Sequence, residues 1–192
     1  PVSIKAEHFF GAPASERVVE VRVDLRPIEF KPDGFKDYSF TDTTKKFVRK
    51  PIILPEKKSD ENGQAVFDLK LPEGLLPPSA IECTIGATVK ETGGRAVSSY
   101  MERTVDAYPY YIGIRQAKEG YAAPNEKVKF DYVVVSPAGD KIEHPELEVS
   151  VCKIVWNTLL KKDDKGGYRY ISEDKEETIL KETVATNASG EF

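Results

Sequence analysis

The stretch VEVRVDLR, residues 19–26, alternates apolar and charged side chains at every second position. In an extended chain, the apolar side chains would share one side and the charged ones the other, as in a half-buried β-strand. We therefore predict a strand here whose core-facing side carries Val19, Val21, Val23 and Leu25.

The same alternation recurs along the chain, and no segment carries a comparable helical period. Turn signals separate the runs, and the pair Gly93-Gly94 predicts a hairpin because two glycines tolerate a primed turn. We expect at least nine short strands. The other alternating sets are Ala65, Phe67, Leu69 and Leu71; Ile81, Cys83, Ile85, Ala87 and Val89; Val128, Phe130, Tyr132 and Val134; and Leu147, Val149 and Val151.

These patterns predict an all-β protein made of antiparallel β-sandwiches of the immunoglobulin or fibronectin type. The 13 prolines lie outside the alternating runs, where they mark loops and strand ends. A β-barrel stays open as the alternative architecture.

A faint internal repeat predicts two domains. APASERV at residues 12–18 and APNEKV at 123–128 each open a strand in corresponding parts of the chain. The junction is expected around the aromatic segment 106–110, which gives domains at 1–107 and 108–192. The second domain is expected to be incomplete at its C-terminal side, with a partner covering its open edge or a smaller core.

Composition argues against several classes of function. A formal net charge of −4 offers no basic field for binding nucleic acid. The sequence contains no run of 18 apolar residues, which a membrane-spanning helix would need. We therefore expect no direct membrane insertion by this segment. His8 and His144, the two histidines, lack a nearby nucleophile pattern, so we predict that the chain is not an enzyme and has no catalytic residues.

No cofactor or metal site is predicted either. The segments 60–63 and 163–166 open like calcium loops but lack the later oxygen ligands, so both are interpreted as turns. Cys83 and Cys152 lack the spacing of a zinc or redox motif. We expect two buried free thiols, with a disulfide as the alternative.

One segment is a candidate contact surface with another domain. Apolar and aromatic residues flank the charged run 161–165, so a projecting hairpin could carry them to a neighbour. The alternative is that they complete the core of their own domain. The candidate interface residues are Trp156, Leu159, Leu160, Tyr168 and Tyr170.

Taken in order, five segments resemble consecutive macroglobulin-like domains of bacterial alpha-2-macroglobulins. They are FFGAPASERVVEVRVDLRP (9–27), SDENGQAVFDLKLPEG (59–74), ETGGRAVSSYMERTV (91–105), YYIGIRQAKEGYAAPNEKVKFDYVVVSPAGDKI (110–142) and VSVCKIVWNTLLKKDDKGGYRY (149–170).

The resemblance implies an extracytoplasmic parent protein that traps proteinases, with these domains as scaffold contacting neighbouring domains of the same chain. Many members of the family carry a Cys-x-Glu-Gln thioester sequence. Neither Cys83 nor Cys152 is followed by it, so no functional residue of the family transfers to this chain. The alternatives are Ig-like modules of a bacterial surface adhesin or of a carbohydrate-binding protein.

Overall fold

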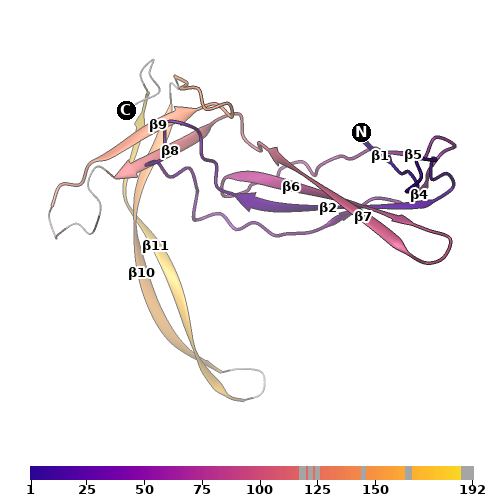
Figure 1. Cartoon of the computed structure of the whole chain (residues 1–192). Helices are drawn as coiled ribbons and strands as arrows, with labels where there is room; N and C mark the ends of the chain where they lie inside the picture. The colour runs from indigo at the N-terminus through magenta and orange to yellow at the C-terminus, as the bar shows by residue number, and fades with distance from the viewer. Residues whose placement is uncertain (117–119, 121–122, 124–125, 144–145, 163–165, 187–192) are drawn as a thin grey trace. The chain divides into compact units, whose positions relative to one another are not determined.

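The computed structural model describes residues 1–116, 120, 123, 126–143, 146–162 and 166–186. Every regular element in these ranges is a β-strand, which confirms the predicted all-β class (Figure 1). The described strands are β1 (Val2–Lys5), β2 (Val18–Ile28), β3 (Ile52–Ile53), β4 (Lys57–Lys58), β5 (Gln64–Phe67), β6 (Ala80–Lys90), β7 (Ala96–Val105), β8 (Tyr111–Gln116), β9 (Phe130–Val135), β10 (Leu147–Lys162) and β11 (Tyr168–Val184).

Two compact units divide the chain. Unit 1 consists of Pro1–Gly113 with Pro137–Gly139, and unit 2 consists of Ile114–Ser136 with Asp140–Phe192. The division at residues 107 and 108 stays a prediction from the sequence.

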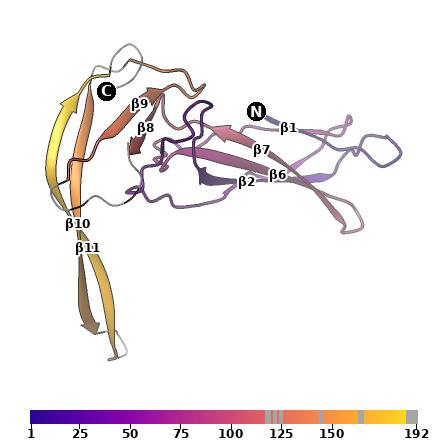
Figure 2. The same cartoon turned by 60° about the vertical axis from the view of Figure 1, so that its left-hand side comes forward.

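Unit 1 is a sandwich of two antiparallel sheets. One sheet runs in the order β3-β2-β6-β7, with β4 also paired to β2, and the other consists of β1 and β5. The pairing of β2 with β6 extends from Val18 opposite Lys90 to Ile28 opposite Ala80. These long neighbours, with β7 beside β6, form the main sheet in both views (Figures 1 and 2).

The core of unit 1 lies where the alternating pattern predicts it. Val19, Val21, Val23 and Leu25 are buried on one face of β2, and the neighbouring face of β6 buries Ile81, Cys83, Ile85 and Ala87. The small sheet closes this core with Val2, Ala65 and Phe67. Full burial of a side chain such as Phe67 contributes about 1.5–3 kcal/mol, so this cluster is the main source of stability in unit 1.

The predicted hairpin at Gly93-Gly94 is confirmed, but its turn differs from the expected primed type. β6 ends at Lys90 and β7 begins at Ala96, and the Glu91 N–H donates to the Arg95 carbonyl at 2.8 Å. Only Gly94 of the glycine pair has a positive φ, 83°. The connection is therefore a five-residue loop with one left-handed position.

A buried tyrosine lies at the end of unit 1. The Tyr111 ring stacks on Phe30 with centroids 4.0 Å apart, and its hydroxyl donates to Asp106 Oδ1 at 2.8 Å. Burial, followed by the hydrogen bond to Asp106, raises the pKa of Tyr111.

In unit 2, β8 pairs with β9 and β10 pairs with β11. The single core face predicted for residues 128–134 is wrong in part, because Val128 and Phe130 are about two-fifths exposed. Val133, Val134 and Val135 are instead all fully buried. Three consecutive buried valines are typical of a strand end that is covered on both faces. In this part of β9, burial therefore does not follow the alternation from which the core face was predicted.

Candidate interaction surface

The β10–β11 pair is a long antiparallel ribbon (Figure 2). Its register runs from Leu147 opposite Val184 to Lys162 opposite Tyr168, and shifts by one residue between Val151 and Cys152. The predicted hairpin arms on both sides of residues 163–165 are confirmed, while the tip itself lies outside the described residues.

The register divides the five candidate interface residues between two faces. Residues directly opposite each other in an antiparallel pair project to the same side, and neighbours along a strand project to opposite sides. Leu160 lies opposite Tyr170 and Lys162 opposite Tyr168, so Trp156, Leu160, Tyr168 and Tyr170 share one face. Leu159 lies opposite Ile171 on the other face.

The shared face is open to solvent. Trp156 is 67% exposed, Leu160 55%, Tyr168 67% and Tyr170 77%. Ile154, 51% exposed, extends the apolar surface by one position toward the start of β10. Within the described residues, these side chains are therefore not part of a core.

We call the exposed set Ile154, Trp156, Leu160, Tyr168 and Tyr170 the aromatic face. Two carboxylates border it, because Trp156 lies opposite Asp174 and Ile154 opposite Glu176. Within the described residues, no ion pair involves either carboxylate, whereas Lys175 on the opposite face pairs with Glu177 at 3.4 Å. A complementary partner surface would be apolar with basic groups at its edge.

The acidic run 173–177, interpreted from the sequence as a solvated rim, is exposed along β11. Its members alternate between the two faces, so only Asp174 and Glu176 border the aromatic face. Sequence spacing alone does not fix this division, because the register depends on the bulge near Val151.

The histidine, cysteine and acidic side chains form no metal-binding cluster in the described part of the chain. Among the described residues, no group of three or more His, Cys, Asp or Glu side chains could hold a metal ion. His8 lies in unit 1 and stacks on Phe10 with ring centroids 5.3 Å apart. His144 lies outside the described residues.

The turn interpretation of residues 60–63 is confirmed. Asp60 Oδ1 accepts hydrogen bonds from the backbone N–H groups of Asn62 at 2.9 Å and Gln64 at 2.8 Å. This carboxylate is therefore engaged in holding the turn that leads into β5. The second calcium-like segment, 163–166, lies largely outside the described residues.

The two cysteines have different environments. Both are free, as expected, but only Cys83 is buried, so the prediction of a buried thiol is wrong for Cys152. The Cys152 Sγ lies 3.8 Å from the Thr178 hydroxyl on the neighbouring strand β11. Burial raises the pKa of Cys83.

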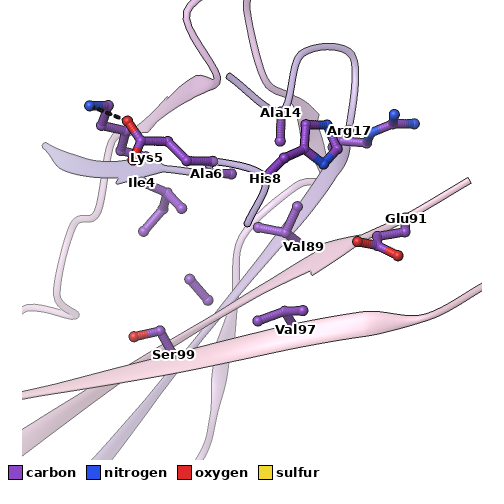
Figure 3. A pocket seen from close by; sticks show the side chains of 12 residues that line it. Ile4, Lys5, Ala6, His8, Ala14, Arg17, Val89, Glu91, Val97 and Ser99 are labelled. Carbon is purple, nitrogen blue, oxygen red and sulfur yellow. Dashed lines mark ion pairs between the residues drawn. The ribbon is translucent and has the colours of Figure 1, made fainter. Parts of the chain in front are cut away.

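Sequence reasoning missed a cavity of about 210 Å³ in unit 1. Figure 3 shows Ile4, Ala6, His8 and Arg17 on one side and Val89, Val97 and Ser99 on the other. On the inner face of β7, Ser99 and Arg103 interrupt the apolar residues Val97 and Met101, which are 65% and 42% exposed, so the sequence gives no regular alternation there.

No helix in the described part of the chain is long and apolar enough to cross a membrane.

Both halves of the chain match known domain families. Residues 1–106 match the family described as Bacterial Alpha-2-macroglobulin MG5 domain, and residues 113–192 match Bacterial macroglobulin domain 6.

Curated relatives align over nearly the whole chain. An alpha-2-macroglobulin of Pasteurella multocida (strain Pm70) is 25% identical over 191 residues, which are 98% of this chain and 10% of the relative. An alpha-2-macroglobulin homolog of Yersinia pestis is 27% identical over 189 residues, with 98% and 9% covered. The chain thus spans about a tenth of the length of these relatives.

Solved structures agree on the fold. The native conformation of E. coli alpha-2-macroglobulin superposes with a TM-score of 0.72 at 17% identity, over 99% of this chain and 13% of the other. A Salmonella alpha-2-macroglobulin reacted with methylamine gives 0.69 at 18% identity, again over 99% and 13%.

Proposed function

The chain belongs to the bacterial alpha-2-macroglobulin family, and from that premise we propose that it is scaffold within a proteinase-trapping protein. Its two domains, 1–107 and 108–192, hold other parts of the parent protein in position. The chain itself is not an enzyme, and the parent acts outside the cytoplasm, in the periplasm or at the cell surface. Its partners are neighbouring domains of the parent and, for the whole protein, proteinases.

The observation that carries this proposal is the open aromatic face of unit 2. A domain that worked alone would leave few aromatic side chains in one exposed stripe. We infer that the aromatic face packs against another domain of the parent, with Asp174 and Glu176 meeting basic groups at its edge.

Proteinase challenge of the full-length parent tests the trapping role. Several unrelated proteinases are added, a native gel is run before and after, and the cut sites are mapped. We expect cuts confined to one segment outside residues 1–192, a large mobility shift and retained proteinase. Scattered nicking without a shape change or capture would contradict the proposal and favour an adhesin-like stalk.

Adjacent leucines test the aromatic face. Leu160 and Leu159 are 55% and 49% exposed but project from opposite faces of the ribbon. In the full-length parent, Leu160→Ser should lower the melting temperature and the yield of retained proteinase, because it places a hydroxyl in an apolar contact. Leu159→Ser is the matched control.

In the isolated 192-residue chain both variants should have the same stability, since neither side chain is buried there. No loss with either variant in the parent would remove the aromatic face as a contact. A similar loss of melting temperature and retained proteinase with Leu159→Ser would extend the contact to both faces of the ribbon. Leu159 is one of the interface residues predicted from the sequence.

A further inference from the structure

The cavity in unit 1 lies beside a strand edge that has no partner. β1 pairs only with β5, so the two-stranded sheet ends at β1 within the described residues. The main sheet extends one strand further, to β7, and leaves the inner face of β7 uncovered. The cavity occupies this step between the two sheets, as its lining from residues 4–8, β6 and β7 shows (Figure 3).

Backbone groups along β1 are directed at this step. The Ala6 N–H donates to the Gly63 carbonyl at 2.8 Å, and the Ala6 carbonyl accepts from Ala14 at 3.0 Å. Alternate residues of a strand direct their backbone groups to opposite edges. Ser3, Lys5 and Glu7 therefore present their N–H and C=O groups on the edge away from β5, where the described residues provide no strand.

The floor of the step carries apolar side chains on either side of Ser99. On β7, Val97 lies opposite Val89 and Met101 opposite Ile85, and both β7 residues continue the core face of β6. Val97 is 65% exposed and Met101 42%. A strand laid over them would bury this face in the way that β1 and β5 bury the rest of the core.

A buried donor lies at the end of the cavity. Arg17 Nη1 donates to the Thr92 hydroxyl at 2.7 Å, but Arg17 Nε is buried and has no acceptor among the described residues. Buried donors in folded proteins are nearly always paired. A carbonyl or carboxylate oxygen entering the cavity would supply the missing acceptor.

We propose that the cavity is a strand-acceptor site, filled by an extended segment of the same parent protein from outside residues 1–192. The occupant pairs its backbone with Ser3, Lys5 and Glu7 and places alternate apolar side chains over Val97 and Met101. It also brings an oxygen acceptor to Arg17. The parent is the source because the chain spans only a tenth of its relatives, and because a permanently open edge invites aggregation.

Adjacent serines on β7 provide the test. Ser99 lines the cavity, whereas Ser98 lies on the outer face and hydrogen-bonds Thr88 at 2.8 Å. Each is changed singly, Ser99→Cys or Ser98→Cys, in a Cys152→Ser background, and maleimide labelling is located by mass spectrometry. Both positions should label in the isolated chain, and only Ser98→Cys should label rapidly in the full-length parent.

Two further measurements distinguish a paired strand from a domain face that covers the cavity without pairing. Amide exchange in the peptide 1–10 should be about tenfold slower in the parent than in the isolated chain, because a strand protects backbone N–H groups. A photo-crosslinker on Ser99→Cys should then join a peptide of the same molecule outside residues 1–192. Arg17→Met should raise the labelling of Ser99→Cys in the parent by removing the donor.

Rapid labelling of Ser99→Cys in both proteins would overturn the proposal. Protection without slower exchange in residues 1–10 would also overturn it, since a domain face would then cover β7 without pairing to β1. A crosslink to a different molecule would contradict the assigned source. The proposal rests on the chain being part of a larger protein, but these readings fail or succeed independently of proteinase capture.

Discussion

Gly63 holds a position that no other residue can occupy without strain. Its φ is 74°, and a Cβ there would lie 2.3 Å from the Ala6 carbonyl oxygen that β1 directs toward the turn. Gly74 has a similar φ of 70°, but a Cβ at that position would have no other atom within 4 Å. An alanine at Gly74 would therefore suffer backbone strain alone, whereas an alanine at Gly63 would suffer both backbone strain and steric overlap.

We predict that Gly74→Ala costs about 1 kcal/mol of the free energy of unfolding, which is the penalty for a left-handed alanine. Gly63→Ala should cost about 3 kcal/mol or more, because the turn must also move away from Ala6. Urea unfolding followed by circular dichroism measures both. Equal costs would show that the contact with Ala6 relaxes freely.

The thiols give a second prediction at this scale. Cys152 is exposed and Cys83 is buried in the core of unit 1, where burial also raises its pKa. At pH 8 a maleimide should modify Cys152 rapidly and Cys83 only on unfolding of unit 1. Rapid modification of two thiols per chain in the native protein would contradict the described core.

Charged residues link the long strands of unit 1 across their solvent face. Arg26 on β2 donates to Glu82 on β6, and Lys90 on β6 donates to Glu20 on β2. These hydrogen bonds lower the pKa values of Glu82 and Glu20. A carboxylate with a lowered folded pKa adds stability above its unfolded pKa and loses it as the pH falls through the folded value.

Stability of unit 1 should therefore fall as the pH drops below 4.5, the ordinary glutamate pKa, and through the lowered pKa values of Glu20 and Glu82, and less steeply at high salt because exposed pairs are screened. Glu82→Gln should flatten part of this dependence, since the variant has no charge to lose at that position. Melting curves across this range measure the effect. An unchanged slope in the variant would assign the acid sensitivity to other carboxylates.

Elements differ in how far the sequence predicts them. The core faces of β2 and β6 are predicted residue by residue, because one face of each strand packs on the core and selects an apolar residue at every second position. The aromatic face is only partly predicted, because the assignment of Leu159 to one side and Leu160 to the other requires the register of β10 with β11. The cavity at β7 was missed because Ser99 and Arg103 interrupt the apolar positions on that face, so β7 lacks the alternation that marks β2 and β6.

The whole chain combines units with different amounts of core. Unit 1 buries side chains such as Phe67 and Ile81 between two sheets, whereas the described strands of unit 2 form two-stranded sheets. A two-stranded ribbon is marginally stable by itself. In urea, amides of β10 and β11 should become exchangeable before those of β2 and β6, which native-state hydrogen exchange measures.

A single cooperative transition, with all four strands opening together, would contradict this order. It would show that the two units stabilise each other strongly enough to unfold as one domain.

Hydrogen–deuterium exchange along β10 and β11, compared between the isolated chain and the full-length parent, tests the central claim most directly. If the chain is scaffold that docks through its aromatic face, peptides covering 154–160 and 168–171 should exchange much more slowly in the parent. Equal exchange in the two proteins would mean that the ribbon stays uncovered in the assembled molecule, and would contradict its role as a contact between domains.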